Sequence, residues 1–193
     1  MFITFISNFF LIGVSAALTV RYLASESLAY RLLAFFVIFF SQVILIIMSW
    51  GLAGRLYLAN VVLTAAIVFL LSRLIITGKN SPGLFRLPGL NDNRVAAFVL
   101  SLLLGFGIVK IIINLVNPPF GWDSLNYHFT FPVEWLKHGN LQNPITINDD
   151  LAPSYYPING SLIYLWLILP LKNVFLADLG QLPFFALSFL SLY

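Results

Sequence analysis

The stretch "RLLAFFVIFFSQVILIIMSW", residues 31–50, decides the fold. After Arg31 it contains no charged residue, and most of its side chains are aliphatic or aromatic. A helix that crosses a bilayer needs about 20 predominantly apolar residues to span roughly 30 Å of hydrocarbon. The stretch satisfies this requirement, so it predicts a transmembrane helix.

The rest of the chain repeats this composition. Of the 193 residues, 60% are hydrophobic and 9% are charged, whereas soluble domains are about half apolar and about one-quarter charged. Other apolar runs cover 2–20, 56–76, 95–116, 157–171 and 179–193. The sequence therefore predicts an all-α polytopic transmembrane helical bundle with about six spans. The run 2–20 lacks a basic region before it, so we interpret it as a retained span and not as a signal peptide.

The last two apolar runs are atypical. The run 157–171 is short and ends near Pro170, so we expect it to begin within the membrane interface. The run 179–193 is still apolar at Tyr193, without a cap or a closing basic residue. We therefore expect the sequence to be the N-terminal part of a longer protein.

The basic residues predict the orientation. The net charge is +3, and most Lys and Arg residues lie beside the apolar runs. Short cytoplasmic loops carry an excess of Lys and Arg. The connections around 21–31 and 73–94 are rich in them and are predicted to be cytoplasmic. The segment 117–156 is mainly acidic and is predicted to face outward. Nucleic-acid binding is not indicated.

These features divide the chain into three parts. Residues 1–77 are predicted to form three N-terminal transmembrane helices, and 78–94 a cytoplasmic linker rich in Gly, Pro and Asn. Residues 95–193 are predicted to contain a span, the outward loop 117–156 and two further spans. The chain has no Cys, which excludes disulfides and thiolate metal sites.

The outward loop contains an amphipathic pattern. At about 100° per residue, one side of a helix would carry Trp122, Leu125, Phe129, Val133 and Leu136. This predicts a juxtamembrane helix that lies on the bilayer surface and is kinked at Pro132. The same spacing gathers Asp123, Tyr127, Thr130 and Glu134 on its polar side. It points His128 and Trp135 elsewhere, so this helix alone cannot bring every polar residue to one site.

Two charged residues near this helix have alternative interpretations. Asp123 is placed to cap the helix N-terminus, and it is also a candidate catalytic carboxylate; the two roles are compatible. Lys110 lies about two turns before the end of the preceding run. It either extends along the helix to the interface or binds an anionic headgroup or phosphate.

Two longer stretches carry a family resemblance, namely "NPPFGWDSLNYHFTFPVEWLKHGNL" (117–141) and "YYPINGSLIYLWLILPL" (155–171). An Asp opens a juxtamembrane helix after a span, a Tyr-His pair and a Trp-Leu-x-x-Gly end follow, and a Tyr-Pro element leads into the next span. This order resembles the first extracytoplasmic loop and next span of GT-C glycosyltransferases. The resemblance is strongest to bacterial members of the glycosyltransferase family 39-like group, which are related to protein O-mannosyltransferase and aminoarabinose transferase.

The resemblance implies an enzyme of the bacterial cytoplasmic membrane. It would transfer a sugar, with inversion, from a polyprenyl-phosphate-linked donor to a protein, lipid or glycan acceptor outside the cytoplasm. The resemblance places the general base on Asp123. Inversion needs a carboxylate opposite the leaving group to take the acceptor's proton. His128 is implied in binding donor phosphate or sugar, or it is an interfacial His bonded to backbone.

Further candidates complete the predicted site. The charge of the leaving phosphate must be stabilised, and Lys110 and His128 are the nearby candidates. Tyr127 and Tyr156 are candidates for substrate contact, although Tyr156 also suits an interfacial aromatic belt. Asp149 and Asp150 would supply a second acid, bind a divalent cation or simply solvate a turn.

The chain departs from the resemblance in two ways. Relatives usually open with the span before the catalytic loop and continue for several more spans, whereas here three helices come first. The alternative interpretation is a non-catalytic membrane module, either a transporter fragment or an assembly partner, in which the outward segment is an amphipathic lid.

Overall fold

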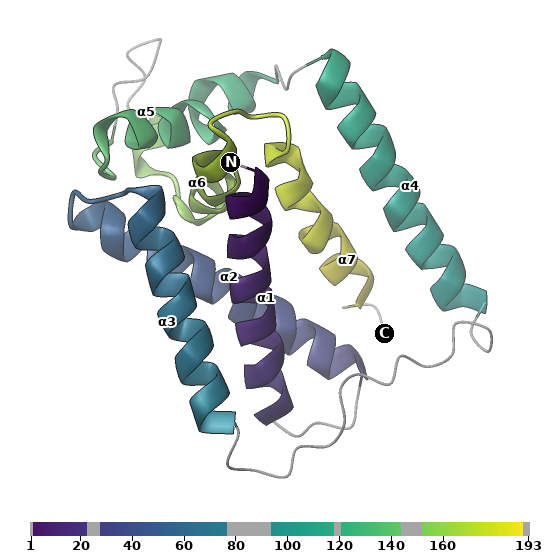
Figure 1. Cartoon of the computed structure of the whole chain (residues 1–193). Coiled ribbons are helices and arrows are strands. Elements are labelled where there is room, and N and C mark those ends of the chain that lie inside the picture. Colours follow the sequence, from purple (N-terminus) through teal and green to yellow (C-terminus); the bar gives the residue numbers. More distant parts are fainter. Residues whose placement is uncertain (1, 23–27, 77–93, 118–120, 144–151, 191–193) are drawn as a thin grey trace.

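The computed structural model describes residues 2–22, 28–76, 94–117, 121–143 and 152–190 (Figure 1). Every regular element in this part of the chain is helical, which confirms the all-α prediction. The longer helices are α1 (Phe2–Tyr22), α2 (Leu28–Leu52), α3 (Leu58–Ile76), α4 (Arg94–Val116), α5 (Thr130–His138), α6 (Asn159–Leu171) and α7 (Leu182–Leu190). Shorter turns are η1 (Ser124–His128), η2 (Ala152–Tyr155) and η3 (Ala177–Gln181).

The three N-terminal helices are confirmed as long and apolar. α1, α2 and α3 have 21, 25 and 19 residues, and each is apolar enough to cross a membrane. At about 1.5 Å per residue, each reaches roughly the 30 Å of a hydrocarbon core. Among the described helices these three meet the requirements of a span, and they support the interpretation of a membrane protein.

Small polar residues join α1, α2 and α3. Ser15 is fully buried, its Oγ lies 2.8 Å from Oγ of Ser72, and it accepts a hydrogen bond of 3.1 Å from Nε2 of Gln42. Small residues let transmembrane helices approach closely and hydrogen-bond across the interface. Trp50 Nε1 adds a further link by donating to Thr64 Oγ1 at 2.8 Å, which ties α2 to α3.

Within the described residues, the later helices do not meet the length and composition required of a span. α6 has 13 residues, or about 20 Å of length, which is less than a hydrocarbon core requires. It is buried on nearly all sides between α1, α2 and α5, as expected of a core helix that is hydrophobic all round. α7 has 9 residues after the turn η3, and the described apolar part of α4 covers Ser101–Ile113. Six spans therefore remain a prediction.

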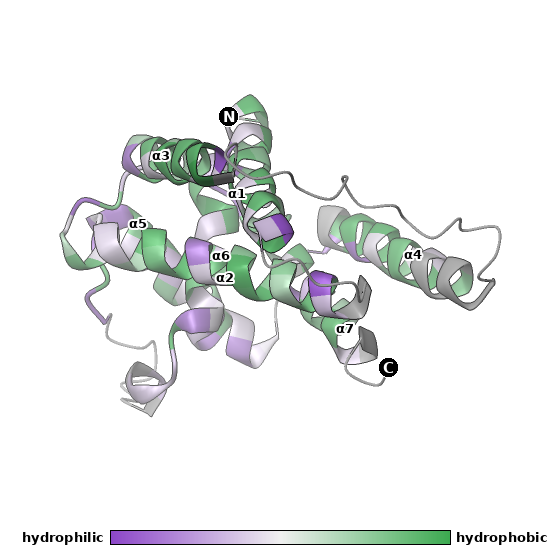
Figure 2. Cartoon of the chain, turned by 90° about the horizontal axis from the view of Figure 1, so that it is seen from below, coloured by the Kyte–Doolittle hydropathy of each residue, from purple (hydrophilic) through white to green (hydrophobic). Residues whose placement is uncertain are grey.

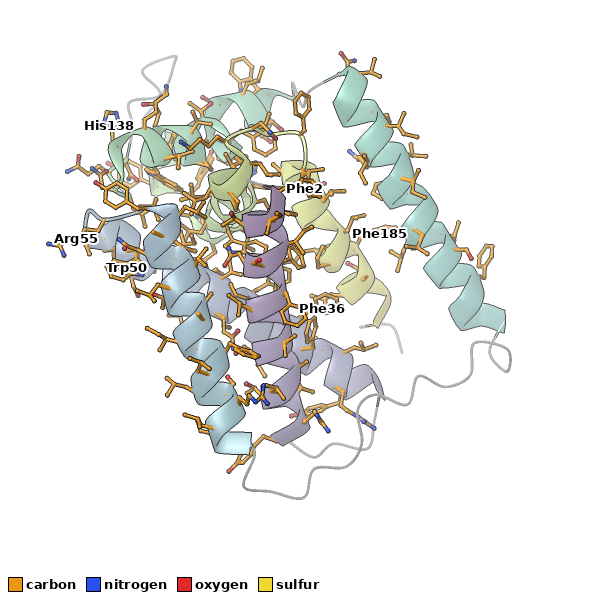
Figure 3. All side chains as sticks on the ribbon, viewed as in Figure 1. Phe2, Phe36, Trp50, Arg55, His138 and Phe185 are labelled. Atoms are coloured by element: carbon orange, nitrogen blue, oxygen red, sulfur yellow. The ribbon has the colours of Figure 1, made fainter. Side chains whose placement is uncertain are left out.

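Helix α5 lies across one end of the bundle, beside the connection between α2 and α3 (Figure 1). The Leu56 N–H donates to the Gly139 carbonyl at 2.9 Å, and the Leu141 N–H donates to the Gly51 carbonyl at 3.2 Å. Figure 3 shows Arg55 and His138 projecting at the same corner. The C-terminal ends of α1 and α3 lie at the other end. The predicted orientation of these connections in a membrane stays a prediction, and the linker 78–93 lies outside the described residues.

The predicted single helix with a kink at Pro132 is wrong. The chain forms the π-helical turn η1, and α5 begins only at Thr130, so that Pro132 falls in the first turn of a new helix. Proline is tolerated there because the first turn does not need its N–H. Thr130 Oγ1 donates to the Leu125 carbonyl across the junction.

The side of this segment that packs on the bundle was not predicted. Trp122 and Leu125 are exposed, as a side that lies on a bilayer would be, whereas Phe129, Phe131 and Trp135 are buried in the core. A π turn contains more residues than an α turn, so it rotates the following helix away from a uniform 100° spacing. Figure 2 shows that α1, α3 and α4 are mainly hydrophobic, whereas hydrophilic residues are frequent around α5 and the neighbouring turns.

Candidate functional site

A polar aromatic cluster lies where η1 meets the start of α6. The ring centroids of Tyr127 and His128 are 4.2 Å apart, and that of Tyr156 is 5.4 Å from that of Tyr127. On the other side, the ring of His128 meets the ring of Tyr164 edge-on at 5.7 Å. We call these residues, together with Asp123, the η1 cluster. The fold thus brings Asp123, Tyr127, His128 and Tyr156 into one region, although uniform helical spacing had pointed His128 away from Asp123.

The wide turn η1 positions the cluster. The Phe129 N–H donates to the Ser124 carbonyl at 3.0 Å, which closes a turn of five residues. Such π turns are rare and occur frequently at functional sites. In this turn the rings of Tyr127 and His128 lie close together although the residues are adjacent in sequence.

Asp123 lies at the start of this turn in helical conformation, with φ of −64° and ψ of −34°, and its side chain makes no capping hydrogen bond. The capping interpretation is therefore wrong, because a capping side chain would accept a backbone N–H of the first turn. Asp123 is exposed. Its carboxylate remains accessible to a molecule that approaches from water.

His128 is half-buried, and this burial lowers its pKa from 6.5, an effect that the nearby Asp123 carboxylate partly opposes. Its Nδ1 is buried and has no hydrogen-bond partner among the described residues, and the same holds for Oδ1 of Asn126. Leaving a buried polar atom unpaired costs about 1–3 kcal/mol. The described structure therefore does not support a His128 Nδ1 bonded to backbone.

Burial also raises the pKa of Tyr127, and the neighbouring Asp123, Tyr156 and Tyr164 raise it further. Tyr127 therefore stays a neutral phenol that can donate a hydrogen bond. The exposed ring of Tyr156 lies beside it. Together the rings form an amphipathic surface with apolar faces and polar tips.

Tyr164 and Gln181 are site residues that the sequence analysis missed. The Tyr164 ring packs edge-on against Phe129 at 5.1 Å as well as against His128, and its Oη accepts a hydrogen bond of 3.1 Å from Gln181 Nε2. A tyrosine within the otherwise apolar run 157–171 was the available signal, because a buried Tyr hydroxyl usually has a polar partner. Gln181 has no such signal, since only the fold brings η3 to α6.

Lys110 does not join the cluster through any contact in the described structure. Its helix α4 packs against η3 and α7. The Lys110 Nζ lies 5.9 Å from the centroid of the Phe106 ring on the same helix, within cation–π range. The Phe106 ring in turn stacks on Phe185 at 5.4 Å. The suggested phosphate contact of Lys110 therefore stays a prediction.

The acidic candidates divide into two groups. Asp149 and Asp150 lie outside the described residues, so their role as a second acid or cation ligand stays a prediction. Within the described part of the chain, no three His, Cys, Asp or Glu side chains gather as a metal site would require.

Glu134, which the helical spacing had grouped with Asp123, pairs instead with Lys137 at 2.6 Å and His138 at 3.5 Å. The hydrogen bond from Lys137 lowers the pKa of Glu134.

Comparison with known proteins adds no relative. No family model matches the chain, and neither the curated proteins nor the solved structures contain a significant match. The functional interpretation therefore depends on the residues of the η1 cluster and on the local resemblance over about 110–175.

Proposed function

We propose that this chain belongs to a GT-C-like membrane glycosyltransferase that transfers a sugar, with inversion, from a polyprenyl-phosphate donor to an acceptor outside the cytoplasm. The observation that carries the proposal is the position of an exposed carboxylate, Asp123, beside Tyr127 and His128 at one end of an apolar helical bundle. In the proposed enzyme α4, α6 and α7 complete about six spans.

Asp123 acts as the general base. An acceptor hydroxyl that attacks the anomeric carbon must lose its proton as the new bond forms, and a carboxylate on the face opposite the leaving group can take it. The exposure of Asp123 and its lack of a capping bond support this role, because the acceptor reaches the carboxylate from water. A positioned general base typically contributes about 10²–10⁴-fold to the rate.

His128 and Tyr127 bind the phosphate of the donor. The phenol of Tyr127 donates one hydrogen bond, and the half-buried imidazole of His128 lies beside it. A bound phosphate would favour the protonated form of His128, because an opposite charge nearby raises the pKa of a histidine. The rings of Tyr127, Tyr156 and Tyr164 then border the space for the sugar.

Lys110, Asp149 and Asp150 have further roles in the proposed enzyme. Lys110 would stabilise the departing lipid phosphate. Asp149 or Asp150 would supply a second acid or hold a divalent cation. The donor itself would reach the site from the bilayer, which is the natural solvent of its polyprenyl chain.

The test is sugar transfer by variants of the intact gene product in native membranes. Asp123→Asn and Asp123→Ala should lower transfer from a polyprenyl-phosphate-linked sugar by about 10²–10⁴-fold while the protein accumulates normally. Glu134→Gln is the matched control, because Glu134 is a nearby carboxylate engaged with Lys137, and it should leave transfer unchanged. Unchanged transfer in both Asp123 variants would exclude the base role.

The alternative function, a non-catalytic module with a lid, is favoured by two other observations. α5 covers the bundle end with the buried Phe131 and Trp135. In α1, Asn8 is buried, and both polar atoms of its amide lack a partner among the described residues, a feature typical of functional positions in transporter spans. A loss of function on replacing Asn8 with Leu, together with full function of Asp123→Ala, would select this alternative.

A further inference from the structure

An apolar pocket lies along the side of α6 that carries Ile163, Trp166 and Leu167. It has a volume of about 570 Å³, within the size range of ligand pockets, and its lining is almost entirely apolar. Phe5 and Phe9 of α1, Phe39 of α2 and Trp166 of α6 supply aromatic rings to it, and Gly180 and Leu182 close it from η3 and α7. The Phe9 ring meets those of Phe39 and Trp166 at 5.5 and 4.9 Å, so the rings form a continuous wall.

The pocket opens onto a surface that faces hydrocarbon in a membrane. α1 and α2, which form one side of it, are both long and apolar enough to span a bilayer. The pocket residues Ile6 and Phe10 of α1 are exposed apolar side chains. A polar molecule would lose its hydrogen bonds there without replacement, so the lining selects a purely hydrocarbon group.

A packed wall separates this pocket from the η1 cluster. Ile163 and Leu167 of α6 line the pocket, whereas Tyr164 faces His128. At Gly180, a Cβ atom would lie 3.0 Å from Leu167 Cδ1 and 3.5 Å from Tyr164 Cε1, which shows how closely η3 and α6 approach. The pocket and the η1 cluster therefore adjoin across closely packed residues of α6 and η3.

The size of the pocket favours a single chain of limited length. A volume of about 570 Å³ lies in the middle of the range for pockets that hold one ligand of moderate size. This size suits one acyl chain better than a polyprenyl chain of many isoprene units. We propose that the pocket binds one acyl chain of a bilayer phospholipid as a fixed structural lipid. The proposal does not depend on the proposed enzymatic function.

The test is photolabelling of the full chain in bilayer discs of phosphatidylethanolamine and phosphatidylglycerol. The discs contain a phosphatidylglycerol with a diazirine in the middle of one acyl chain, and labelled residues are mapped by mass spectrometry. Label should concentrate on pocket residues of α1 and α2. Ile6→Trp and Leu179→Trp, which place a larger ring at partly exposed pocket positions, should each lower that label several-fold. Ile3→Trp is the control, because Ile3 is 81% exposed on the same helix and does not line the pocket.

Two results would overturn the proposal. The first is an even spread of label over the exposed apolar residues of the wild-type chain. That pattern would show ordinary contact with the bilayer, and it is measured without any variant. The second is loss of pocket label on adding polyprenyl phosphate but not on adding an equal amount of unlabelled phosphatidylglycerol. That loss would assign the pocket to the donor's chain.

Discussion

Replacing Trp135 with Ala should release α5 from the end of the bundle. The Trp135 side chain is fully buried (0% exposed), its ring packs edge-on against Phe131 at 5.8 Å, and its Nε1 donates to the Gln142 carbonyl at 2.9 Å. Truncating a buried Trp to Ala costs about 3–5 kcal/mol. The lost hydrogen bond adds about 1 kcal/mol. We therefore expect the docking of α5 to weaken by about 4 kcal/mol or more.

Cleavage by trypsin after Lys137 reports this release. Lys137 lies in the last turn of α5, so the protease cuts there only when α5 opens, and the rate follows the population of the open form. A loss of about 4 kcal/mol corresponds to cleavage roughly a thousand times faster. Trp135→Phe keeps most of the ring and should give an intermediate rate.

Trp122→Ala is the matched control for this prediction. Trp122 belongs to the same segment but is 71% exposed, so its removal should change stability by no more than about 0.5 kcal/mol and cleavage by about two-fold. Mass spectrometry of the fragment that ends at Lys137 gives both rates in lipid discs. Equal rates in Trp122→Ala and Trp135→Ala would refute the assignment of Trp135 to the core.

The remaining predictions concern the helix interface and the η1 cluster. Ser15→Ala removes the contacts to Ser72 and Gln42 and should lower the free energy of unfolding by about 0.6–1.7 kcal/mol. Adding Ser72→Ala should then cost little more, while Ser49→Ala, which loses only a bond within its own helix, is the control. Because burial lowers the pKa of His128, the unfolded state binds that proton more tightly, and the free energy of unfolding should rise with pH between the lowered pKa and 6.5. Denaturation at a series of pH values measures this rise, which should disappear in His128→Gln. His138→Gln is the control and should keep the rise, because the His138 side chain is 68% exposed.

The sequence predicted the first three helices because each is an uninterrupted apolar run of sufficient length. The same reasoning proposed 157–171 as a span, and this stays a prediction, because α6 is a 13-residue helix buried among α1, α2 and α5. Apolar periodicity does not distinguish a short transmembrane segment from a core helix that is covered on all sides.

Part of the candidate site was also predictable. The proximity of Tyr127 to Asp123 follows from local helix geometry, whereas uniform helical spacing pointed His128 elsewhere. A uniform spacing of 100° per residue does not predict which side chains share a face after η1. The turn there is closed by the Phe129 N–H and the Ser124 carbonyl and is wider than an α turn. Tyr164 and Gln181 join the site only through packing of α6 and η3, which no local pattern encodes.

The central claim is that Asp123 acts on the non-cytosolic side, where it meets a lipid-borne sugar donor. The chain contains no Cys, so Asp123→Cys, Arg55→Cys and Arg73→Cys each carry a single thiol at an exposed position. A membrane-impermeant maleimide applied to sealed vesicles of either orientation should label Asp123→Cys and Arg55→Cys only from the non-cytosolic side, and Arg73→Cys only from the cytosolic side. Labelling of Asp123→Cys from the cytosolic side would contradict the proposed function.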